Sequence, residues 1–413
     1  MSQMPFSGYV VLQNPISNEG HLDSWHVLFI KLLHEAGFKI IALTSDPSEL
    51  LRKLTSLSVP LSKDIIVLNP QPKNDFKRII LGFGQRLRAI VSLAMRVPRR
   101  KVTHFLPSQL KQELNGILHR YPGQIQAIFN LYIDAYDPAS ALWRNFQLKE
   151  DVPFLGLCIT PSVDQNEGYY NNPRYVGTCF LDEAVVNEYR ERYSNKRFEY
   201  LPDIADTRIR DNFLTCNKHV AEIKARARGR KIVFMGGSIG QQKNLAKWHQ
   251  VIRTSPQDNW FFVQIGRINR NNLTKADEIS LESMSTSMPE NLYVFDGYLS
   301  DERVFNEIIA TSDVIFAVYR NFERSSNMLS KAAYFSKPIL VSRQGLMGER
   351  VTQFKIGCPV SADDVDSMTQ GLNTVLQIAD IEANFEAYRH VFSMDAMQNK
   401  LVKFLEQSVN PLK

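Results

Sequence analysis

The sequence predicts an α/β protein built from two tandem, doubly wound domains. Its 413 residues exceed what one hydrophobic core usually fills. Short apolar runs alternate with helical patterns, which is typical of parallel sheets. The alternation stops at a polar, basic segment, 217–230, and then starts again. We therefore expect a domain boundary near residue 210, with one domain at 1–210 and a second at 211–380.

The first series begins with an apolar strand at 9–12 and a helix at 24–35. Gly37 stands where that helix should end, and a strand at 38–43 follows at once, as a βαβ unit requires. Further strands are expected at 65–68, 127–132, 154–159, 176–180 and 200–202.

The second series repeats this order. We expect strands at 231–235, 260–265, 292–295, 313–318 and 337–342, with helices at 244–253, 301–311 and 327–335. Apolar residues then recur at helical spacing between 380 and 409, with no strand after them. The segment 381–413 is therefore predicted to be a helical arm that packs back toward the N-terminal domain.

Composition excludes several classes of protein. The chain is 44% hydrophobic and 22% charged, and no apolar run reaches the roughly 18 residues of a membrane span. No secretion signal is evident, so we expect a cytoplasmic protein. A net charge of +6 is too mild to predict nucleic-acid binding. The cysteines lack metal-ligand spacing, and we expect neither a metal ion nor a cofactor; they are Cys158, Cys179, Cys216 and Cys358.

Basic residues are concentrated between 77 and 101, where no acidic residue occurs. They are interleaved with apolar residues, so the stretch is amphipathic. One interpretation is a solvated helix whose apolar side joins the core. The other is peripheral contact with anionic lipid at the inner membrane face, or with an acidic acceptor.

A glycine-rich turn follows the predicted strand 231–235. Gly236 and Gly237 let the backbone approach a phosphate, Ser238 adds a hydroxyl, and Lys243 adds a positive charge. Neither the Walker pattern nor GxGxxG matches this turn. The alternative is a tight turn with a solvated lysine.

A second loop, 319–327, follows the predicted strand 313–318. Ser326 or Asn327 would cap the next helix, leaving the amides of Met328 and Leu329 free to hold an anion. Arg320 adds positive charge, and Glu323 could accept hydrogen bonds from sugar hydroxyls. An ordinary surface loop before a capped helix is the alternative. A third loop, after the first strand, contains Gly20 and His21, which could either serve a ligand or cap a helix.

These residues resemble the large family of retaining GT-B glycosyltransferases, most strongly from Lys231 onward. The stretch 234–244 is similar to the family's strand, glycine turn and pyrophosphate-binding lysine, and 294–314 is similar to its segments beside the nucleobase. The family pairs two glutamates eight positions apart. Glu323 matches the first, which contacts the transferred sugar, whereas Lys331 replaces the second, which holds the ribose hydroxyls.

The resemblance implies two Rossmann-like domains facing a cleft, and metal-independent transfer of a sugar, with retention, from a nucleotide-sugar donor. It implies catalytic roles for Glu323 and Lys243, and an acceptor side at Gly20, His21, Asp134 and Asp164. It also implies a donor site comprising Gly236, Gly237, Ser238, Lys243, Gly266, Tyr298, Arg320, Ser326, Asn327, Met328, Leu329 and Lys331.

The sugar, the nucleotide and the acceptor stay open, and the acceptor could be a glycan, a lipid or a small molecule. Two other functions also stay open. One is a non-catalytic relative that binds a nucleotide sugar or a partner protein, which Lys331 favours. The other is a nucleotide-sugar epimerase or hydrolase, because a fold does not fix its chemistry.

Overall fold

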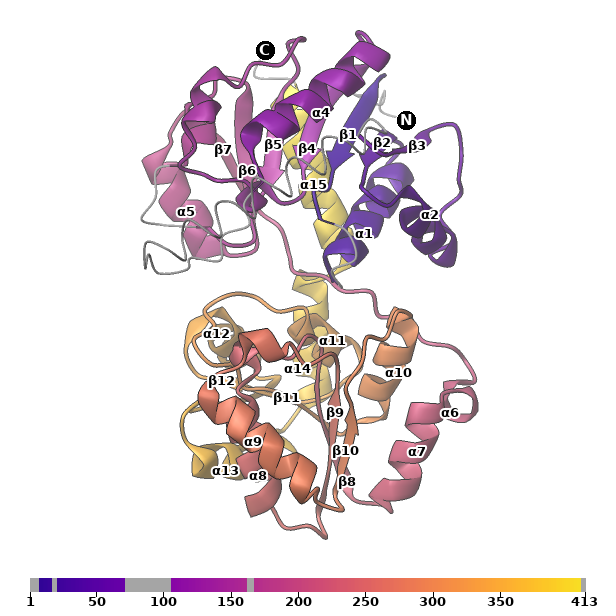
Figure 1. Ribbon diagram of the computed structural model, residues 1–413, viewed down its shortest axis with the longest axis vertical. Coiled ribbons are helices and arrows are strands. Elements are labelled where there is room, and N and C mark those ends of the chain that lie inside the picture. Colours follow the sequence, from indigo (N-terminus) through magenta and orange to yellow (C-terminus); the bar gives the residue numbers. More distant parts are fainter. Residues whose placement is uncertain (1–6, 17–20, 71–104, 162–166, 410–413) are drawn as a thin grey trace, which may run out of the picture. The chain divides into compact units, whose positions relative to one another are not determined.

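The computed structural model describes residues 7–16, 21–70, 105–161 and 167–409, without the side chains of 21–24. The chain forms two compact units (Figure 1). Unit 1 comprises 1–201 together with 398–413, and unit 2 comprises 202–397. The basic stretch 77–101 lies outside the described residues, so lipid contact through it stays a prediction.

Unit 1 contains a parallel sheet of seven strands in the order β3-β2-β1-β4-β5-β6-β7. Its strands are β1 Tyr9–Gln13, β2 Lys39–Leu43, β3 Ile65–Leu68, β4 Ile125–Asn130, β5 Phe154–Leu157, β6 Tyr175–Phe180 and β7 Arg197–Tyr200. Its helices are α1 His21–Glu35, α2 Pro47–Ser56, α4 Pro107–Arg120 and α5 Glu183–Arg192, with short 3-10 turns at Ile133–Ala135, Ala141–Asn145 and Gly168–Asn171.

Unit 2 contains a parallel sheet of six strands in the order β10-β9-β8-β11-β12-β13. Its strands are β8 Lys231–Gly236, β9 Trp260–Ile265, β10 Leu292–Phe295, β11 Val314–Ala317, β12 Ile339–Ser342 and β13 Gly357–Val360. Its helices are α6 Phe213–Cys216, α7 Lys218–Ala227, α8 Leu245–Thr254, α9 Lys275–Thr286, α10 Glu302–Thr311, α11 Met328–Tyr334, α12 Gly345–Phe354, α13 Val365–Val375 and α14 Ile381–Val391. The last helix, α15 Met394–Val409, begins in unit 2 and ends in unit 1.

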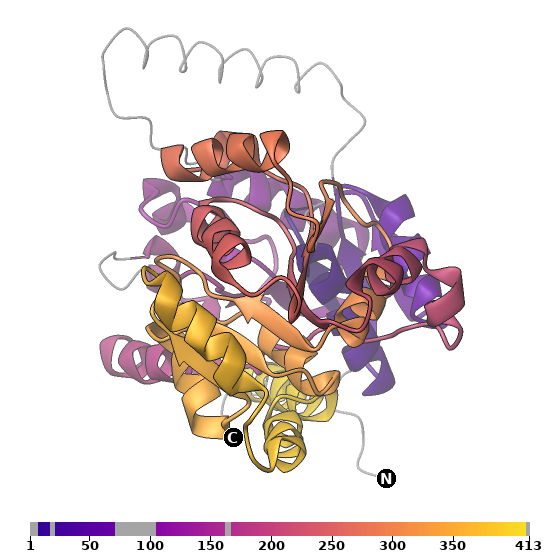
Figure 2. The same ribbon diagram turned by 90° about the horizontal axis from the view of Figure 1, so that it is seen from below.

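Helices cover both faces of the six-stranded sheet (Figure 2). Successive strand residues point to opposite faces. On β8, Val233 joins the buried cluster that also contains Trp248 of α8, whereas Phe234 points the other way and meets Phe305 of α10. Because both faces are covered, the strands are apolar runs without alternation, which is the pattern that predicted them.

The predicted doubly wound architecture is confirmed, and most predicted elements lie within a few residues of observed ones. The segment 217–230 is a correction: its polar composition suggested a connecting segment, but Lys218–Ala227 forms α7. Asn217 caps that helix by accepting from the amides of His219 and Val220, and apolar residues at helical spacing bury one face. The elements α2, α4, α5, α6, α9, α12, α13 and β13 were not predicted.

Polar residues meet where the order of the seven-stranded sheet reverses, between β1 and β4. The amide nitrogen of Gln13 donates to Glu113 at 3.2 Å and to the hydroxyl of Tyr136 at 3.1 Å. Asn130 in turn donates to the amide oxygen of Gln13. Burial raises the pKa of Glu113 to about 7, against the weaker lowering effect of the Gln13 hydrogen bond.

This raised pKa makes the stability of unit 1 depend on pH. The folded state favours protonated Glu113. The contribution of this group to the free energy of unfolding is therefore fully present below about pH 4.5 and is lost as the pH rises through about 7. We expect Glu113→Gln to be more stable than the parent chain at pH 8 by about 1–3 kcal/mol, and equally stable at pH 4.5. Urea unfolding measures both. Exposed Glu191→Gln is the control, and an equal gain at both pH values would contradict the assignment.

Candidate functional site

The order of the six-stranded sheet reverses between β8 and β11. From β8 the chain proceeds to β9 and β10 on one side, and β11 starts the other side. At such a point the loops after two neighbouring strands run in opposite directions, and open parallel sheets bind ligands in the crevice between these loops. The glycine-rich turn follows β8, and the loop 319–327 follows β11, so both predicted loops lie at this point.

The turn after β8 depends on two glycines in close contact. Gly237 has φ +100° and its amide donates to the carbonyl of Ile265 at 3.0 Å. Gly266, which follows β9, has φ +141°, and a Cβ placed on it would lie 1.8 Å from the carbonyl oxygen of Gly237. Any side chain at 266 would therefore push the turn away. Gly266 therefore packs directly against the backbone of the turn.

Lys243 places a positive charge over this turn. Its side chain is half-buried, and its Nζ donates to the hydroxyl of Tyr319 at 2.7 Å. Nζ also lies 4.2 Å from the centre of the Tyr319 ring and 3.6 Å from where a Cβ of Gly237 would be. No carboxylate among the described residues pairs with it. The charge is therefore held in place but not neutralised, as an anion-binding site requires.

Arg320 clamps the two loops together. Its guanidinium donates to the amide oxygen of Asn244 at 2.8 Å and to Asp277 at 3.4 Å, and its backbone amide donates to the carbonyl of Gln242 at 2.9 Å. Burial favours a higher pKa for Asp277, but the hydrogen bond from Thr274, those from backbone amides and the charge of Arg320 lower it overall. These hydrogen bonds show that Arg320 connects the loop after β11 to the loop after β8.

Glu323 has a fixed backbone and an available carboxylate. Gly345, with φ +78°, packs so closely that a Cβ on it would lie 2.7 Å from Cα of Glu323. The amide of Leu346 donates to the carbonyl of Glu323 at 3.1 Å. The side chain is exposed and makes no hydrogen bond or ion pair with any residue that the structure describes. It can therefore accept hydrogen bonds from a ligand.

The first amides of α11 are paired, although the sequence suggested that they would be free. The amide of Met328 donates to the hydroxyl oxygen of Ser326 at 3.4 Å, and the amide of Leu329 donates to the Ser326 carbonyl at 3.0 Å. These two amides already have acceptors within the loop, so they are not unpaired as expected, and their contact with an anion stays a prediction. Asn327 has helical backbone angles and does not cap with its side chain. The amides of Met328 and Leu329 therefore donate to Ser326 in the turn that precedes α11.

A buried ion network, which sequence reasoning missed, supports the loop after β11. Ser325 donates to Asp203 at 2.7 Å and accepts from Arg350 at 2.6 Å. Burial raises the pKa of Asp203 to about 6, against the lowering effects of the Ser325 hydrogen bond and the Arg350 charge. These residues lie far apart in sequence, and only the hydroxyl of Ser325 within the loop could have suggested the contact.

The side chain of Lys331 is buried among protein acceptors. Its side chain is 1% exposed, and its ammonium lies 2.5 Å from Glu302 and 3.3 Å from the carbonyl of Asp206, with a further bond to Asn306. An ammonium has three N–H donors, and protein groups here accept all of them. This geometry leaves no N–H of Lys331 for the direct donor contact that the sequence suggested.

The remaining predicted donor-side residues are spread around the turn. Ser238 and Tyr298 are exposed. A Cβ on Gly236 would lie 2.4 Å from the Phe234 ring, so this glycine makes room for that ring. Tyr319 was not predicted as a site residue, although its place directly after a buried strand was a signal.

On the acceptor side, Gly20 and Asp164 lie outside the described residues, and His21 begins α1. Asp134 lies beside Thr160, whose amide and hydroxyl both donate to Oδ2, at 2.9 and 2.5 Å. Among the residues that the structure describes, its buried Oδ1 has no hydrogen-bond partner, and neither has Nδ2 of Asn14, which follows β1. Sequence reasoning did not identify Asn14.

No three or more His, Cys, Asp or Glu side chains come together among the described residues in a way that could hold a metal ion. No helix among those residues combines the length and apolar character needed to cross a bilayer.

Comparison with solved structures finds glycosyltransferases. A glycosyltransferase from Rickettsia africae superposes with a TM-score of 0.63 at 14% identity, covering 98% of this chain and 100% of that one. An α,α-trehalose-phosphate synthase (UDP-forming) from Burkholderia vietnamiensis gives 0.63 at 14%, covering 97% and 100%. An Anabaena protein, HepE, in complex with UDP and glucose gives 0.63 at 10%, covering 96% and 99%.

No family model and no curated protein sequence matches the chain. At such low identities the structural matches establish the fold alone. They agree with the two parallel sheets of seven and six strands and with the helical C-terminal segment. The chain therefore has the GT-B fold.

Proposed function

We propose that this chain transfers a sugar from a nucleotide-sugar donor to the hydroxyl of an acceptor, with the donor pyrophosphate at Lys243 and the turn after β8. One observation carries this proposal: the uncompensated charge of Lys243 lies over the Gly237 backbone, where the order of the sheet reverses. The fold neighbours, among them a UDP-forming synthase and a protein holding UDP and glucose, support a donor of this class.

In this scheme, negative charge grows on the pyrophosphate as the sugar leaves. Lys243 stabilises that charge in a position that requires no rearrangement, because Tyr319 already fixes its ammonium. Glu323 accepts hydrogen bonds from hydroxyls of the transferred sugar. The bond between the anomeric carbon and the phosphate oxygen breaks, and the acceptor hydroxyl attacks from that same face. Its proton passes to the departing phosphate oxygen, so the transfer balances and the anomeric configuration is retained. In this scheme Lys243 supplies the positive charge at the pyrophosphate, and no metal ion is invoked.

The acceptor is proposed to bind at the carboxyl edge of the seven-stranded sheet. A buried polar atom without a partner costs about 1–3 kcal/mol, so a ligand that supplies the partner gains affinity. At this edge, no described residue pairs with the donor Nδ2 of Asn14 or with the acceptor Oδ1 of Asp134. A hydroxylated molecule such as a sugar can satisfy both, because each hydroxyl donates and accepts.

Lys243→Met should weaken nucleotide binding about tenfold to a hundredfold, because a charge-assisted hydrogen bond to phosphate is lost. Thermal shift and calorimetry with UDP, GDP, ADP, CMP and their sugar conjugates measure this. Lys247→Met on α8 removes the same charge four positions away and should bind normally. If no nucleotide stabilises the parent chain, a non-catalytic role is favoured and the proposal fails.

Glu323→Gln should separate binding from chemistry. Its carboxylate is proposed to contact the sugar and not the nucleotide, so affinity for the bare nucleoside diphosphate should stay within about twofold. Release of nucleotide from the sugar conjugate should fall about a hundredfold or more. Glu349→Gln, on α12, is the control. Unchanged release would contradict the catalytic role, and interconversion of sugar nucleotides without an acceptor would indicate an epimerase.

Asp134→Asn tests the acceptor side. Asparagine keeps an oxygen for Thr160 but replaces the unpartnered oxygen with an N–H donor. With a panel of sugars and glycolipids that stimulate nucleotide release, we expect KM for the stimulating acceptor to rise about tenfold while nucleotide affinity is unchanged. The nearby Asp137→Asn should behave like the parent chain. A parent-like KM in Asp134→Asn would remove this residue from the acceptor site.

A further inference from the structure

The first half of α10 lies beside the proposed donor site. The ring of Phe305 contacts that of Phe234 on β8 at a centroid distance of 5.4 Å, and Phe234 in turn abuts Gly236 at the start of the glycine turn. The centre of the Phe305 ring is also 5.2 Å from the ammonium of Lys331. Residues on the first turn of α10 are therefore close to the carboxyl end of β8.

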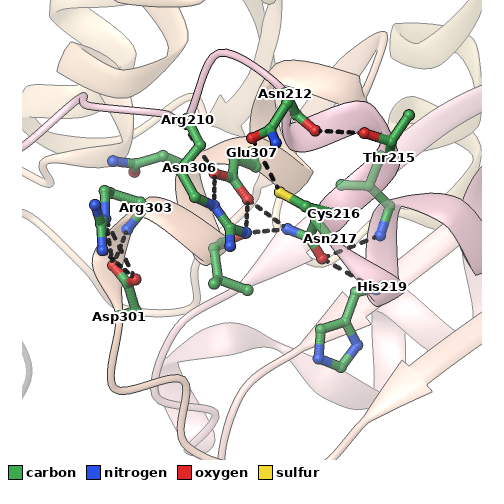
Figure 3. A network of polar contacts seen from close by, with 12 residues as sticks. Arg210, Asn212, Thr215, Cys216, Asn217, His219, Asp301, Arg303, Asn306 and Glu307 are labelled. Atoms are coloured by element: carbon green, nitrogen blue, oxygen red, sulfur yellow. Dashed lines mark hydrogen bonds and ion pairs between the residues drawn. The ribbon is translucent and has the colours of Figure 1, made fainter.

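Buried contacts hold α10 rigidly in this position (Figure 3). Arg210 forms a two-point ion pair with Glu307 at 2.7 and 2.6 Å, and Asn217 donates to the same carboxylate at 2.7 Å. Asn306 donates to the carbonyls of Asp206 and Arg208 at 2.9 and 3.0 Å. Polar groups on this helix are therefore presented at fixed positions, as recognition of a ligand requires.

Glu302, the first residue of α10, is oriented by one of its two carboxylate oxygens. Oε1 lies 2.5 Å from the buried ammonium of Lys331, and the Glu302 side chain is 34% exposed. Oε2 makes no hydrogen bond with any residue that the structure describes. One oxygen is thus fixed inside the protein, while the other keeps its capacity to accept hydrogen bonds from outside.

A carboxylate held in this way can accept hydrogen bonds from two neighbouring hydroxyls of a ligand. Two hydroxyls on adjacent carbons can both donate to one carboxylate, and carboxylates recognise ribose in this way in other doubly wound folds. A nucleotide whose pyrophosphate lies at Lys243 carries its ribose next to that pyrophosphate. The covalent structure of the nucleotide therefore keeps the ribose near the glycine turn. Glu302 lies at the start of α10, the helix beside that turn.

We propose that Glu302 accepts hydrogen bonds from the 2′- and 3′-hydroxyls of the donor ribose, and that Lys331 is the positioning residue that holds it. This inference rests on the proposed function, because it requires a nucleotide at Lys243. Lys331 then contributes to nucleotide recognition without touching the ligand. The site is specific for ribonucleotides whichever base it prefers.

The experiment compares the nucleoside diphosphate that stabilises the parent chain with its 2′,3′-dideoxy counterpart, by calorimetry. The parent chain should bind the ribonucleotide at least about tenfold more tightly. Glu302→Gln keeps an oxygen for Lys331 but loses the charge, so it should lose about tenfold affinity for the ribonucleotide and almost none for the dideoxy form. Exposed Glu282→Gln is the matched control.

Three results would overturn the inference. One is equal affinity of the parent chain for both nucleotides. Another is an equal loss for both in Glu302→Gln, which would mean that Glu302 only supports the fold. The third is a Glu302→Gln variant that still discriminates as the parent does. Failure of the parent chain to bind any nucleotide would instead overturn the proposed function and this inference with it.

Discussion

The parallel pairing of β8 with β11 is the constraint on which the proposed donor site depends. Val314 and Ile315 of β11 pair with Val233 and Phe234 of β8, so the two strands end at the same edge of the sheet. The loops that follow them are thereby brought together although about 80 residues separate them. Lys243 then meets Tyr319, and the backbone of Arg320 joins that of Gln242. Neither loop holds these groups in place alone.

Two lysines at this edge show how burial decides the use of a charge. Lys243 is half-buried and has a phenol as partner, so its charge remains for a ligand. Lys331 is almost fully buried, and an isolated ammonium there would be costly, so carboxylate, amide and carbonyl oxygens surround it. The first is suited to binding phosphate and the second to positioning a neighbouring acid.

The two sheets carry different chemistry at the points where their strand order reverses. In unit 2 that point combines a lysine with glycine backbone, which suits an anion. In unit 1 it holds amide and carboxyl groups, namely Gln13, Asn130 and Glu113, with Asn14 and Asp134 beyond them. Such groups suit neutral hydroxyls. The same architecture thus presents polar groups of different character at the two edges.

The sequence by itself determined the doubly wound architecture, because strands covered on both faces must be apolar throughout and the helices between them must be amphipathic. It also located the glycine turn, Lys243 and Glu323, since loops after parallel strands are where such sheets bind ligands. It could not identify α7, whose polar surface resembles a linker. Only the tertiary structure decided that Ser326 consumes the amides of α11, that Arg320 braces loops, and that Lys331 holds Glu302. Those outcomes depend on contacts between residues distant in sequence, and local composition carries no record of such contacts.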